Sequence, residues 1–421
     1  MQAKHCVLPN YVLDSLPYSY RPEVKAMTAI ITDVKYRMSL AVIRDLGAAG
    51  VRVIVCHKDD QDGSPPLGFY SKYTAQRHIF SADGYEDRLF SLCRQISESD
   101  GRRVALLPVG AATLAMLAVS DTRERFSHVS GFTIPTSEQL TLLNDKGRVA
   151  ELAASLDIPV PRSYTKHEDE PIGSFISRIP LPCVVKPRWG EGLGLTASMR
   201  YIIANTPEDL SNSYTKFSEL AGEPPLVQEY LPGAAFGCSI LAQNGEIVTK
   251  ICHRRVREFP TSGGPSTCCD AISDPLLEDT AASLASAVGF TGLAMFEFKN
   301  DTEGTPRLLE INPRIWGSYP LTRIAKTGFS YAWYVSSANA GNPDKPLAFP
   351  PQHEIKPRRM IFFPSDIASA SDYFRKGNKK LAFSAVLDFL RPGAKDGLFE
   401  WRDARPALRY WKSLLRKKQQ K

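Results

Sequence analysis

The chain of 421 residues lacks the features that mark several large classes of protein. It has no apolar run of about 18 residues, so we expect no membrane-spanning helix and no membrane partner. The first twenty residues contain no apolar core of the kind that secretory signals carry, so no secretory signal is expected. The pattern GxGxxG is missing from the first predicted strand–helix turn at 32–37, and GxxxxGK[ST] does not occur. These absences exclude a Rossmann dinucleotide fingerprint and a Walker A loop.

Cysteine is scattered rather than clustered. The eight cysteines form no CxxC pair and no Cys/His spacing typical of a zinc site. The adjacent Cys268 and Cys269 are poorly placed for disulfide geometry. We therefore expect a protein of a reducing compartment, which predicts a cytoplasmic location.

The net charge of +7 is unevenly distributed. Residues 354–421 contain 17 Lys and Arg against 7 Asp and Glu, so the rest of the chain is slightly acidic. A basic segment favours acidic partners or nucleic acid. More often such a segment is a solvated helix face, so the sequence does not favour a nucleic-acid partner. The length and the 43% hydrophobic content predict a globular protein of roughly two to four domains.

The first part of the chain has the pattern of an open α/β sheet. Residues 1–24 show no period and are interpreted as an N-terminal arm. The pattern predicts a strand at Ala29–Thr32, a helix at Met38–Ala49 and a parallel strand at Val51–Cys56. Another strand is expected at Val104–Val109, followed by a helix to about Val119. We assign residues 25–135 to this domain, which shows no chemistry of its own.

A glycine-rich segment follows the next predicted strand. A helix is expected from Ser137 to about Leu156, and Leu181–Lys186 is an apolar strand that leads into Pro187–Gly194. Glycines at 190, 192 and 194 allow backbone N–H groups to approach phosphate oxygens closely, and Lys186 supplies a positive charge beside them. The alternative is an ordinary hairpin turn.

Two further segments suit ligand binding. The strand that ends in Gln228-Glu229-Tyr230-Leu231 offers backbone groups beside apolar side chains, which can hold an adenine ring; otherwise it simply links two subdomains. Phe236–Leu241 and Glu246–Cys252 predict a hairpin around Asn244-Gly245. The cations of His253–Arg257 follow at the strand end, then the loop 261–267, and together they suit phosphate or carboxylate. The alternative for both is an ordinary surface loop.

The stretch 291–318 carries the strongest signal. Gly292–Phe298 and Pro306–Ile311 predict a β-hairpin, and side chains that alternate along a strand place Glu310 and Asn312 on one face. Glu297 on the first strand can meet them. Two carboxylates and an amide oxygen near Arg314 suit Mg²⁺ that carries a polyphosphate. A solvated acidic hairpin is the alternative.

Five features in this order resemble the ATP-grasp superfamily over about residues 30–335. They are Lys146, Lys186 with its glycine loop, Gln228–Leu231, Glu297 and Glu310–Arg314. The strings HRRVREFPTSGGPST and LLEINPRIWGS resemble a bacterial subgroup of carboxylate–amine ligases. The resemblance implies an α/β (α+β) fold with a two-lobed core. That core would comprise a lid subdomain at 136–226 and a larger, metal-binding subdomain at 227–341. The remaining 342–421 would form a small basic C-terminal appendage.

The resemblance also implies a role for each matching residue. Lys146 and Lys186 would contact the ATP phosphates, and the lid over them would include Gly190, Glu191, Gly192 and Gly194. Adenine would be held by Gln228, Glu229, Tyr230 and Leu231. Mg²⁺, with Mn²⁺ as an alternative, would be bound by Glu297, Glu310 and Asn312. Arg314 would stabilise the transferred phosphoryl group. Arg255 and His253 are the candidates for holding the acid. Ala235 departs from the family, because many members have an acidic residue near this position for the ribose. Either Glu229 or a neighbour is the substitute, or the ribose contacts are looser.

The expected function is ATP-dependent ligation of a carboxylate to an amine through an acyl phosphate, with release of ADP and phosphate. The expected partners are small molecules, an amino acid or small peptide being the favoured class, and a homodimer is a further hypothesis. Two alternatives stay open: a carboxylase or carbamoyl-phosphate type of ATP-grasp enzyme, and a nucleotide-binding protein without catalysis.

Overall fold

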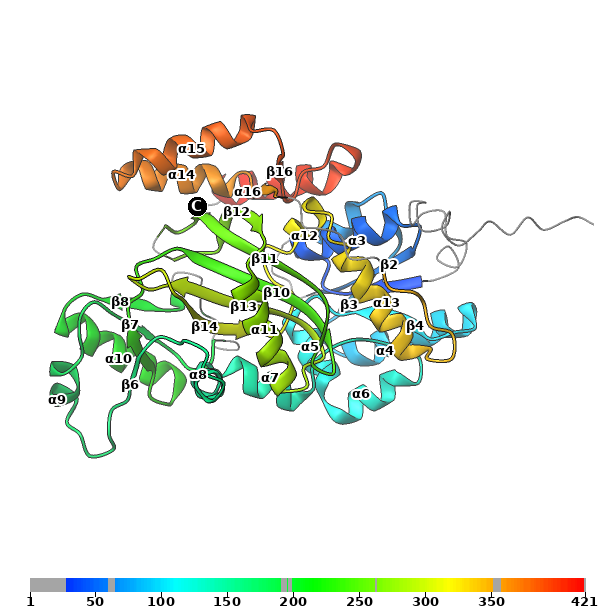
Figure 1. Cartoon of the computed structure of the whole chain (residues 1–421). Coiled ribbons are helices and arrows are strands. Elements are labelled where there is room, and N and C mark those ends of the chain that lie inside the picture. The colour runs from blue at the N-terminus through cyan, green and yellow to red at the C-terminus, as the bar shows by residue number, and fades with distance from the viewer. Residues whose placement is uncertain are drawn as a thin grey trace, which may run out of the picture. The chain divides into compact units, whose positions relative to one another are not determined.

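The computed structural model describes residues 28–59, 65–190, 195, 199–261, 263–350 and 357–419. The chain divides into two compact units, which Figure 1 draws together. The first comprises Met1–Thr133, Ser330–Pro351 and Leu398–Lys421, and the second Ile134–Phe329 and Gln352–Gly397. The predicted arm at 1–24 lies outside the described residues. No helix in the described ranges is long and apolar enough to cross a membrane.

The first unit is built on a five-stranded sheet in the order β3-β2-β1-β4-β5, and every pairing is parallel. This confirms the predicted open parallel sheet. The strands are β1 (Thr28–Ile31), β2 (Arg52–Asp59), β3 (Thr74–Ser81), β4 (Val104–Leu107) and β5 (Ser130–Gly131). Its helices are α3 (Arg37–Ala48), η2 (Leu67–Tyr70), α4 (Tyr85–Asp100), α5 (Ala111–Ala118), α6 (Ser120–Ser127), η4 (Trp401–Asp403), α16 (Arg405–Gln419) and all but the first residue of α13 (Phe329–Gly341).

The last segment of the chain is held in this first unit by a buried ion pair. Nε of Arg44, on α3, donates to the carboxylate of Asp403 at 2.9 Å, and both side chains are buried. Beside it, Leu40 and Leu67 pack against Leu398 and Ala407. The apolar side of α16 is therefore part of the core of the first unit.

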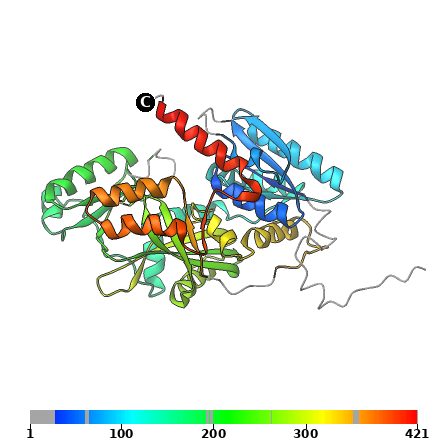
Figure 2. The same ribbon diagram turned by 90° about the horizontal axis from the view of Figure 1, so that it is seen from above.

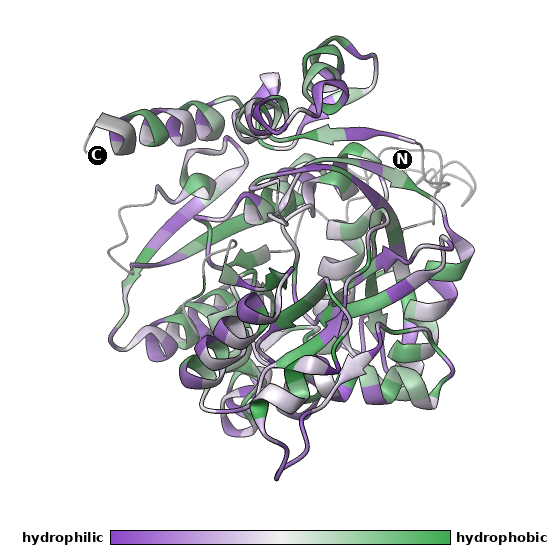
Figure 3. Ribbon diagram, turned by 90° about the vertical axis from the view of Figure 1, so that its left-hand side faces the viewer, coloured by the Kyte–Doolittle hydropathy of each residue, from purple (hydrophilic) through white to green (hydrophobic). Residues whose placement is uncertain are grey.

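The second unit contains two sheets. The larger has the order β14-β13-β10-β11-β12-β15-β16. Its strands are β10 (Ala235–Gln243), β11 (Glu246–Glu258), β12 (Ser266–Ile272), β13 (Gly292–Asn300), β14 (Pro306–Asn312), β15 (Arg359–Ile361) and β16 (Ala394–Asp396). The two predicted hairpins, β10–β11 and β13–β14, are confirmed, and Asn244 and Gly245 both have the positive φ that such a turn requires. Figure 3 shows long hydrophobic stretches in these strands.

The smaller sheet has the order β6-β9-β7-β8, with all pairings antiparallel. Its strands are β6 (Ser163–Tyr164), β7 (Cys183–Lys186), β8 (Ile202–Ala204) and β9 (Leu226–Glu229). The helices of the second unit are α7 (Ser137–Asn144), α8 (Lys146–Ser155), α9 (Ile172–Ser177), α10 (Pro207–Ala221), α11 (Pro275–Ala287), α12 (Pro320–Ile324), α14 (Ser365–Arg375) and α15 (Lys379–Leu390). Each sheet has its own hydrophobic core, so this unit is two-lobed as predicted.

One predicted helix is divided in the structure. The segment from Ser137 to Leu156 forms α7 and α8, because the Asp145 carboxylate accepts hydrogen bonds from Gly147 N and Arg148 N and so begins a new helix. Helices α14 and α15 are separated by a turn in which Gly377 has φ of +82°. Lys146 is thus the first residue of a helix, where the sequence analysis predicted it inside one.

The cations at 253–257 lie within a strand, where the sequence analysis expected a strand end. β11 continues to Glu258 and bulges at Val256, since Arg255 pairs with Cys269 and Arg257 with Cys268. The bulge places Arg255 and Arg257 on opposite faces of the sheet.

The division of the chain into five domains stays a prediction. Its last member, 342–421, is shared between both units and supplies β15 and β16 to the larger sheet.

Candidate functional site

The carboxylates of the β13–β14 hairpin face each other. Glu297 pairs directly with Glu310 across the two strands, and Asn312 lies two residues further along β14 on the same face. The Asn312 amide nitrogen donates to Oε1 of Glu297 at 3.1 Å and to Oε1 of Glu310 at 3.3 Å. The three residues predicted to bind metal are therefore within hydrogen-bonding distance of one another.

The environment shifts the pKa values of the two carboxylates in opposite directions. Burial by itself would raise the pKa of Glu310, but the nearby Lys146 and Lys186 lower it to about 2. The Nζ of Lys146 lies 3.4 Å from Oε2 of Glu310. Burial raises the pKa of Glu297, and the attraction of Arg255 only partly offsets this effect. The negative charge of Glu297 is therefore incompletely neutralised by the protein.

Lys186 reaches the hairpin from the smaller sheet. It is the last residue of β7, its side chain is buried, and Nζ donates to the backbone carbonyl oxygen of Leu309 at 3.3 Å. Burial lowers the pKa of Lys186 to about 8. Lys146 approaches from the start of α8, and a Cβ atom at Gly190 would lie 3.4 Å from its Nζ. Both predicted phosphate-binding lysines thus converge on Glu310.

The helix that carries Lys146 is fixed to the segment after β7. The guanidinium of Arg188 lies 3.1 Å from the Asp145 carboxylate, and the backbone N–H of Lys146 donates to the carbonyl of Arg188 at 3.3 Å. These bonds hold the start of α8 beside the predicted phosphate loop. Glu191, Gly192 and Gly194 lie outside the described residues, so of the loop positions only Gly190 can be placed.

The donor set at the hairpin fits a hard cation. Within the described part of the chain no group of three His, Cys, Asp or Glu could hold a metal, but this site needs only two carboxylates and an amide. Oxygen ligands of this kind suit Mg²⁺, which commonly retains waters and shares phosphate oxygens. The Asn312 oxygen accepts from Arg314 at 3.2 Å, so metal ligation requires the amide to turn over. The raised pKa of Glu297 reflects a charge that a cation would compensate.

Two arginines border the carboxylates. Arg314 follows β14 and donates to Asn312 Oδ1 and to the Ile315 carbonyl, each at 3.2 Å. Arg255, on β11, lies 3.2 Å from the Glu297 carboxylate and 3.3 Å from that of Glu258. The two guanidinium groups add positive charge beside Glu297. Lys146 and Lys186 add positive charge beside the neighbouring Glu310.

His253 is buried in the middle of β11. It pairs with Gly237, and its ring occupies the space that a side chain at Gly237 would need. Burial, with a contribution from Arg255, lowers the pKa of His253 to about 3. The imidazole is therefore neutral near neutral pH and can form hydrogen bonds without carrying charge.

The predicted adenine-binding residues lie at the end of β9 and directly after it. Gln228 is buried and its amide donates to Ser163 Oγ at 3.0 Å. Glu229 forms two bonds with Arg162, donating its N–H to the carbonyl and accepting the Arg162 N–H at its carboxylate, each at 2.9 Å. One carboxylate oxygen of Glu229 is thus held by backbone, and whether Glu229 replaces a ribose-binding acid at Ala235 stays a prediction. Leu231 is buried, and the ammonium of Lys299 lies 5.0 Å from the centre of the Tyr230 ring.

Sequence reasoning missed three polar residues of this region. Tyr201 lies against Gly263, and burial together with Glu258 raises its pKa to about 12. Burial raises the pKa of Glu258 and lowers that of Lys299. Lys299 could have been found from strand alternation, because it lies two residues after Glu297 on the same face. Tyr201 gave no such signal.

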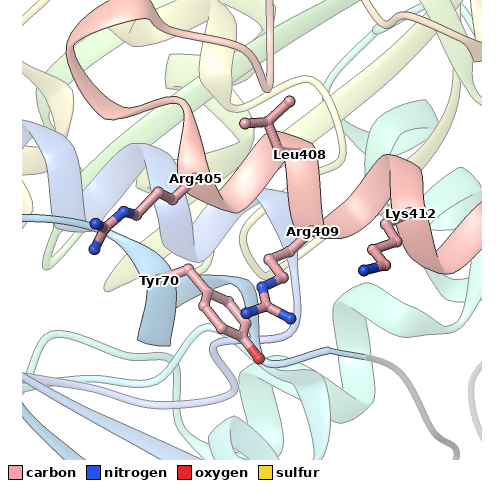
Figure 4. A pocket seen from close by; sticks show the side chains of 5 residues that line it. All are labelled: Tyr70, Arg405, Leu408, Arg409 and Lys412. Atoms are coloured by element: carbon pink, nitrogen blue, oxygen red, sulfur yellow. The ribbon is translucent and has the colours of Figure 1, made fainter.

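A separate cavity of about 460 Å³ lies in the first unit (Figure 4). It is lined by Tyr70, Arg405, Leu408, Arg409 and Lys412. The Arg409 guanidinium lies over the Tyr70 ring, 4.9 Å from its centre. None of the predicted site residues is among its lining residues, so it is not the site described above.

Comparisons with known proteins agree with the predicted superfamily. Residues 222–358 match a family model described as "ATP-grasp in the biosynthetic pathway with Ter operon". A D-alanine–D-alanine ligase of Neisseria meningitidis serogroup B is 26% identical over 179 residues, which cover 40% of this chain and 56% of the ligase. The carbamoyl phosphate synthase large chain of Archaeoglobus fulgidus is 24% identical over 227 residues, covering 52% of this chain and 20% of that one. The match thus spans only about half of the ligase.

Solved structures share the fold. A biotin carboxylase–β,γ-ATP complex from Campylobacter jejuni superposes with a TM-score of 0.59 at 15% identity, covering 79% of this chain and 74% of that one. An N5-carboxyaminoimidazole synthetase from Staphylococcus aureus, complexed with ADP, gives a TM-score of 0.54 at 15% identity, covering 84% and 85%. At this level of identity the likeness concerns the fold alone.

Proposed function

This chain belongs to the ATP-grasp superfamily, and from that premise we propose that it is an ATP-dependent ligase that joins a small carboxylate to an amine. The observation that carries the proposal is the pair Glu297 and Glu310, with Lys146 and Lys186 beside one carboxylate and Arg255 beside the other. Such a set of oxygen ligands and cations suits a nucleoside triphosphate with a divalent cation. The D-alanine–D-alanine ligase match supports an amino acid or small peptide as the substrate class.

A carboxylate must be activated before an amine can displace its oxygen. We propose that the substrate carboxylate oxygen attacks the γ-phosphorus of ATP, which breaks the bond to the β-phosphate and gives an acyl phosphate and ADP. The amine nitrogen then attacks the acyl carbon, phosphate leaves, and the nitrogen loses a proton to form the amide. Both steps depend mainly on positioning and on neutralising phosphoryl oxygens.

The residues of this chain divide these tasks. Lys146 and Lys186 would hold the phosphates, and Arg314 would stabilise the transferred phosphoryl group. Glu297, Glu310 and the turned amide of Asn312 would hold Mg²⁺, or Mn²⁺, which supplies positive charge to the phosphate oxygens when bound. We propose that Gln228–Leu231 hold adenine, with Gly190 and the loop after it as a lid.

Arg255 and His253 are proposed to hold the substrate acid. A group whose pKa is about 3 takes up a proton poorly at neutral pH, so His253 suits the role of a neutral hydrogen-bonding group for the acid better than that of a general base. The amine would therefore arrive neutral. A homodimer and a cytoplasmic location stay predictions.

Product analysis tests the proposal. ATP turnover with Mg²⁺ is measured against pools of amino acids and small carboxylic acids, with the product nucleotide resolved. We expect ADP and phosphate only when an acid and an amine are both present. Glu310→Gln should lower turnover by about 10²–10³-fold, as loss of a charge-stabilising group does elsewhere. Glu303→Gln, in the exposed turn of the same hairpin, is the matched control and should retain activity.

Two other results would contradict the ligase. AMP and pyrophosphate as products would exclude an acyl phosphate. Turnover that requires bicarbonate and no amine would favour a carboxylase or carbamoyl-phosphate type of reaction, which the match to the carbamoyl phosphate synthase large chain keeps as the second candidate.

A further inference from the structure

Helix α15 presents its apolar side outward. Four large side chains at the spacing i, i+3, i+4 and i+7, namely Phe383, Val386, Leu387 and Leu390, form what we call the α15 stripe, and each is between 61% and 80% exposed. The buried residues of the same helix are Ala382, Ala385 and Asp388. A stripe with this spacing ordinarily faces a core, so its outward position calls for an apolar surrounding.

The neighbouring helix carries further exposed apolar side chains. Figures 1 and 2 show α14 and α15 lying side by side, and the two helices are in contact along the hairpin that they form. Ile367 and Phe374 on α14 are each about half exposed. Singly scattered apolar side chains are normal on a protein surface, whereas six large ones on two adjacent helices mark an interaction site.

Buried ion pairs hold the inner side of the hairpin. Asp388 lies 2.7 Å from Arg257 and 2.6 Å from Arg359, and Asp366 lies 2.7 Å from Arg257. Arg257 and Asp366 are fully buried. The hairpin is therefore fixed to the larger sheet by charged groups, which leaves its apolar residues free to face outward.

The tip of the hairpin is strongly basic. Arg375, Lys376, Lys379 and Lys380 fall within six residues at the turn between α14 and α15, and all four are exposed. The acids of the two helices are already occupied, since Asp366 and Asp388 pair with buried arginines and Asp372 contacts Thr261 and Lys376. Across the described ranges, no carboxylate lies within ion-pair distance of Lys379 or Lys380.

We propose that the α14–α15 hairpin docks on a lipid bilayer that contains anionic phospholipids. Helices that lie in a membrane interface combine Phe and Leu on one side with Lys and Arg at the border, so that apolar side chains enter the acyl region and cations meet phosphates. Pairing of this face with a second copy would bring two basic tips and no free acid to one interface, which disfavours self-association.

The proposal is independent of the ligase assignment and revises the sequence-based expectation of no membrane partner. At about 1.5 Å per residue, the 12 residues of α15 extend about 18 Å, well short of the hydrocarbon thickness of about 30 Å. The helix would therefore lie in the plane of the interface, with the stripe facing the acyl chains.

Vesicle flotation with the full chain tests the proposal. Vesicles of phosphatidylcholine alone are compared with vesicles that contain about one-third phosphatidylglycerol, at low and high salt. We expect binding to the anionic vesicles that weakens in salt. The double variant Leu387→Ser, Leu390→Ser should bind at least about tenfold more weakly, because the apolar contacts are lost. Lys379→Ser with Lys380→Ser should weaken binding about 25-fold, from about fivefold for each cation.

Leu276→Ser is the control, because Leu276 is also an exposed leucine, 57% exposed, on α11 of the same unit. It should bind like the unchanged protein, and circular dichroism verifies that all variants are folded. Absence of binding to both vesicles would overturn the proposal. Binding by both double variants that equals the binding of the unchanged protein would overturn it as well. A dimer in sedimentation that the Leu387→Ser, Leu390→Ser variant loses would assign the surface to a second copy instead.

Discussion

The buried lysine at the end of β7 should make ATP binding depend on pH in a defined way. Burial lowers the pKa of Lys186 to about 8, against the usual value of 10.5. Phosphate oxygens attract only the protonated form, so binding should weaken as the pH rises through about 8. For a free-protein pKa of about 8, the apparent Kd doubles at about pH 8 and rises about elevenfold at about pH 9.

Isothermal titration of ATP between about pH 7.5 and 9.5, without divalent cations, measures this dependence apart from metal binding. In Lys186→Arg the guanidinium stays charged throughout, so the slope should disappear. Lys146→Arg is the matched control on the other side of Glu310 and should keep the slope, because the buried Lys186 is unchanged. An affinity that does not change with pH in the unchanged protein, or the same slope in Lys186→Arg, would refute the reasoning.

Two stability predictions can be measured by urea unfolding. Arg257→Met should lower the free energy of unfolding by about 3–5 kcal/mol, because it leaves Asp366 buried without its ion-pair partner and leaves Asp388 with Arg359 alone. Arg254→Met, which breaks an exposed pair, is its control and should cost under about 1 kcal/mol; equal losses would contradict the argument. Gly237→Ala should cost about 1–3 kcal/mol, since the new methyl group overlaps the ring of His253. Adding His253→Ala should recover part of that loss, and no recovery would place the strain elsewhere.

Local patterns were sufficient to predict the β13–β14 hairpin. Alternation along β13 and β14 placed Glu297, Glu310 and Asn312 on one face, and their pairing in the structure follows from that short-range geometry. The parallel sheet of the first unit was likewise predicted from a strand, a helix and a strand in succession. Both depend on residues close together in the sequence.

Local patterns failed where capping or long-range contacts decide the structure. The helical pattern around Lys146 gave one helix, whereas the side chain of Asp145 satisfies backbone donors and begins a second. The cations at 253–257 were read as one cluster, but a bulge places Arg255 by the carboxylates and Arg257 against α14 and α15. No sequence period reveals a bulge of one residue.

The sequence alone determined the types of element and the chemistry that each carries, because turns, strand alternation and helix caps are set by neighbouring residues. Only the tertiary structure decided which charges meet. Lys186 donates to Leu309, 123 residues later in the chain, and Arg257 pairs with Asp388, 131 residues later. The same pairing decided that α15 turns Asp388 inward and its apolar stripe outward. An amphipathic pattern specifies that a helix has two faces, and the partners available in the fold specify which of them is buried.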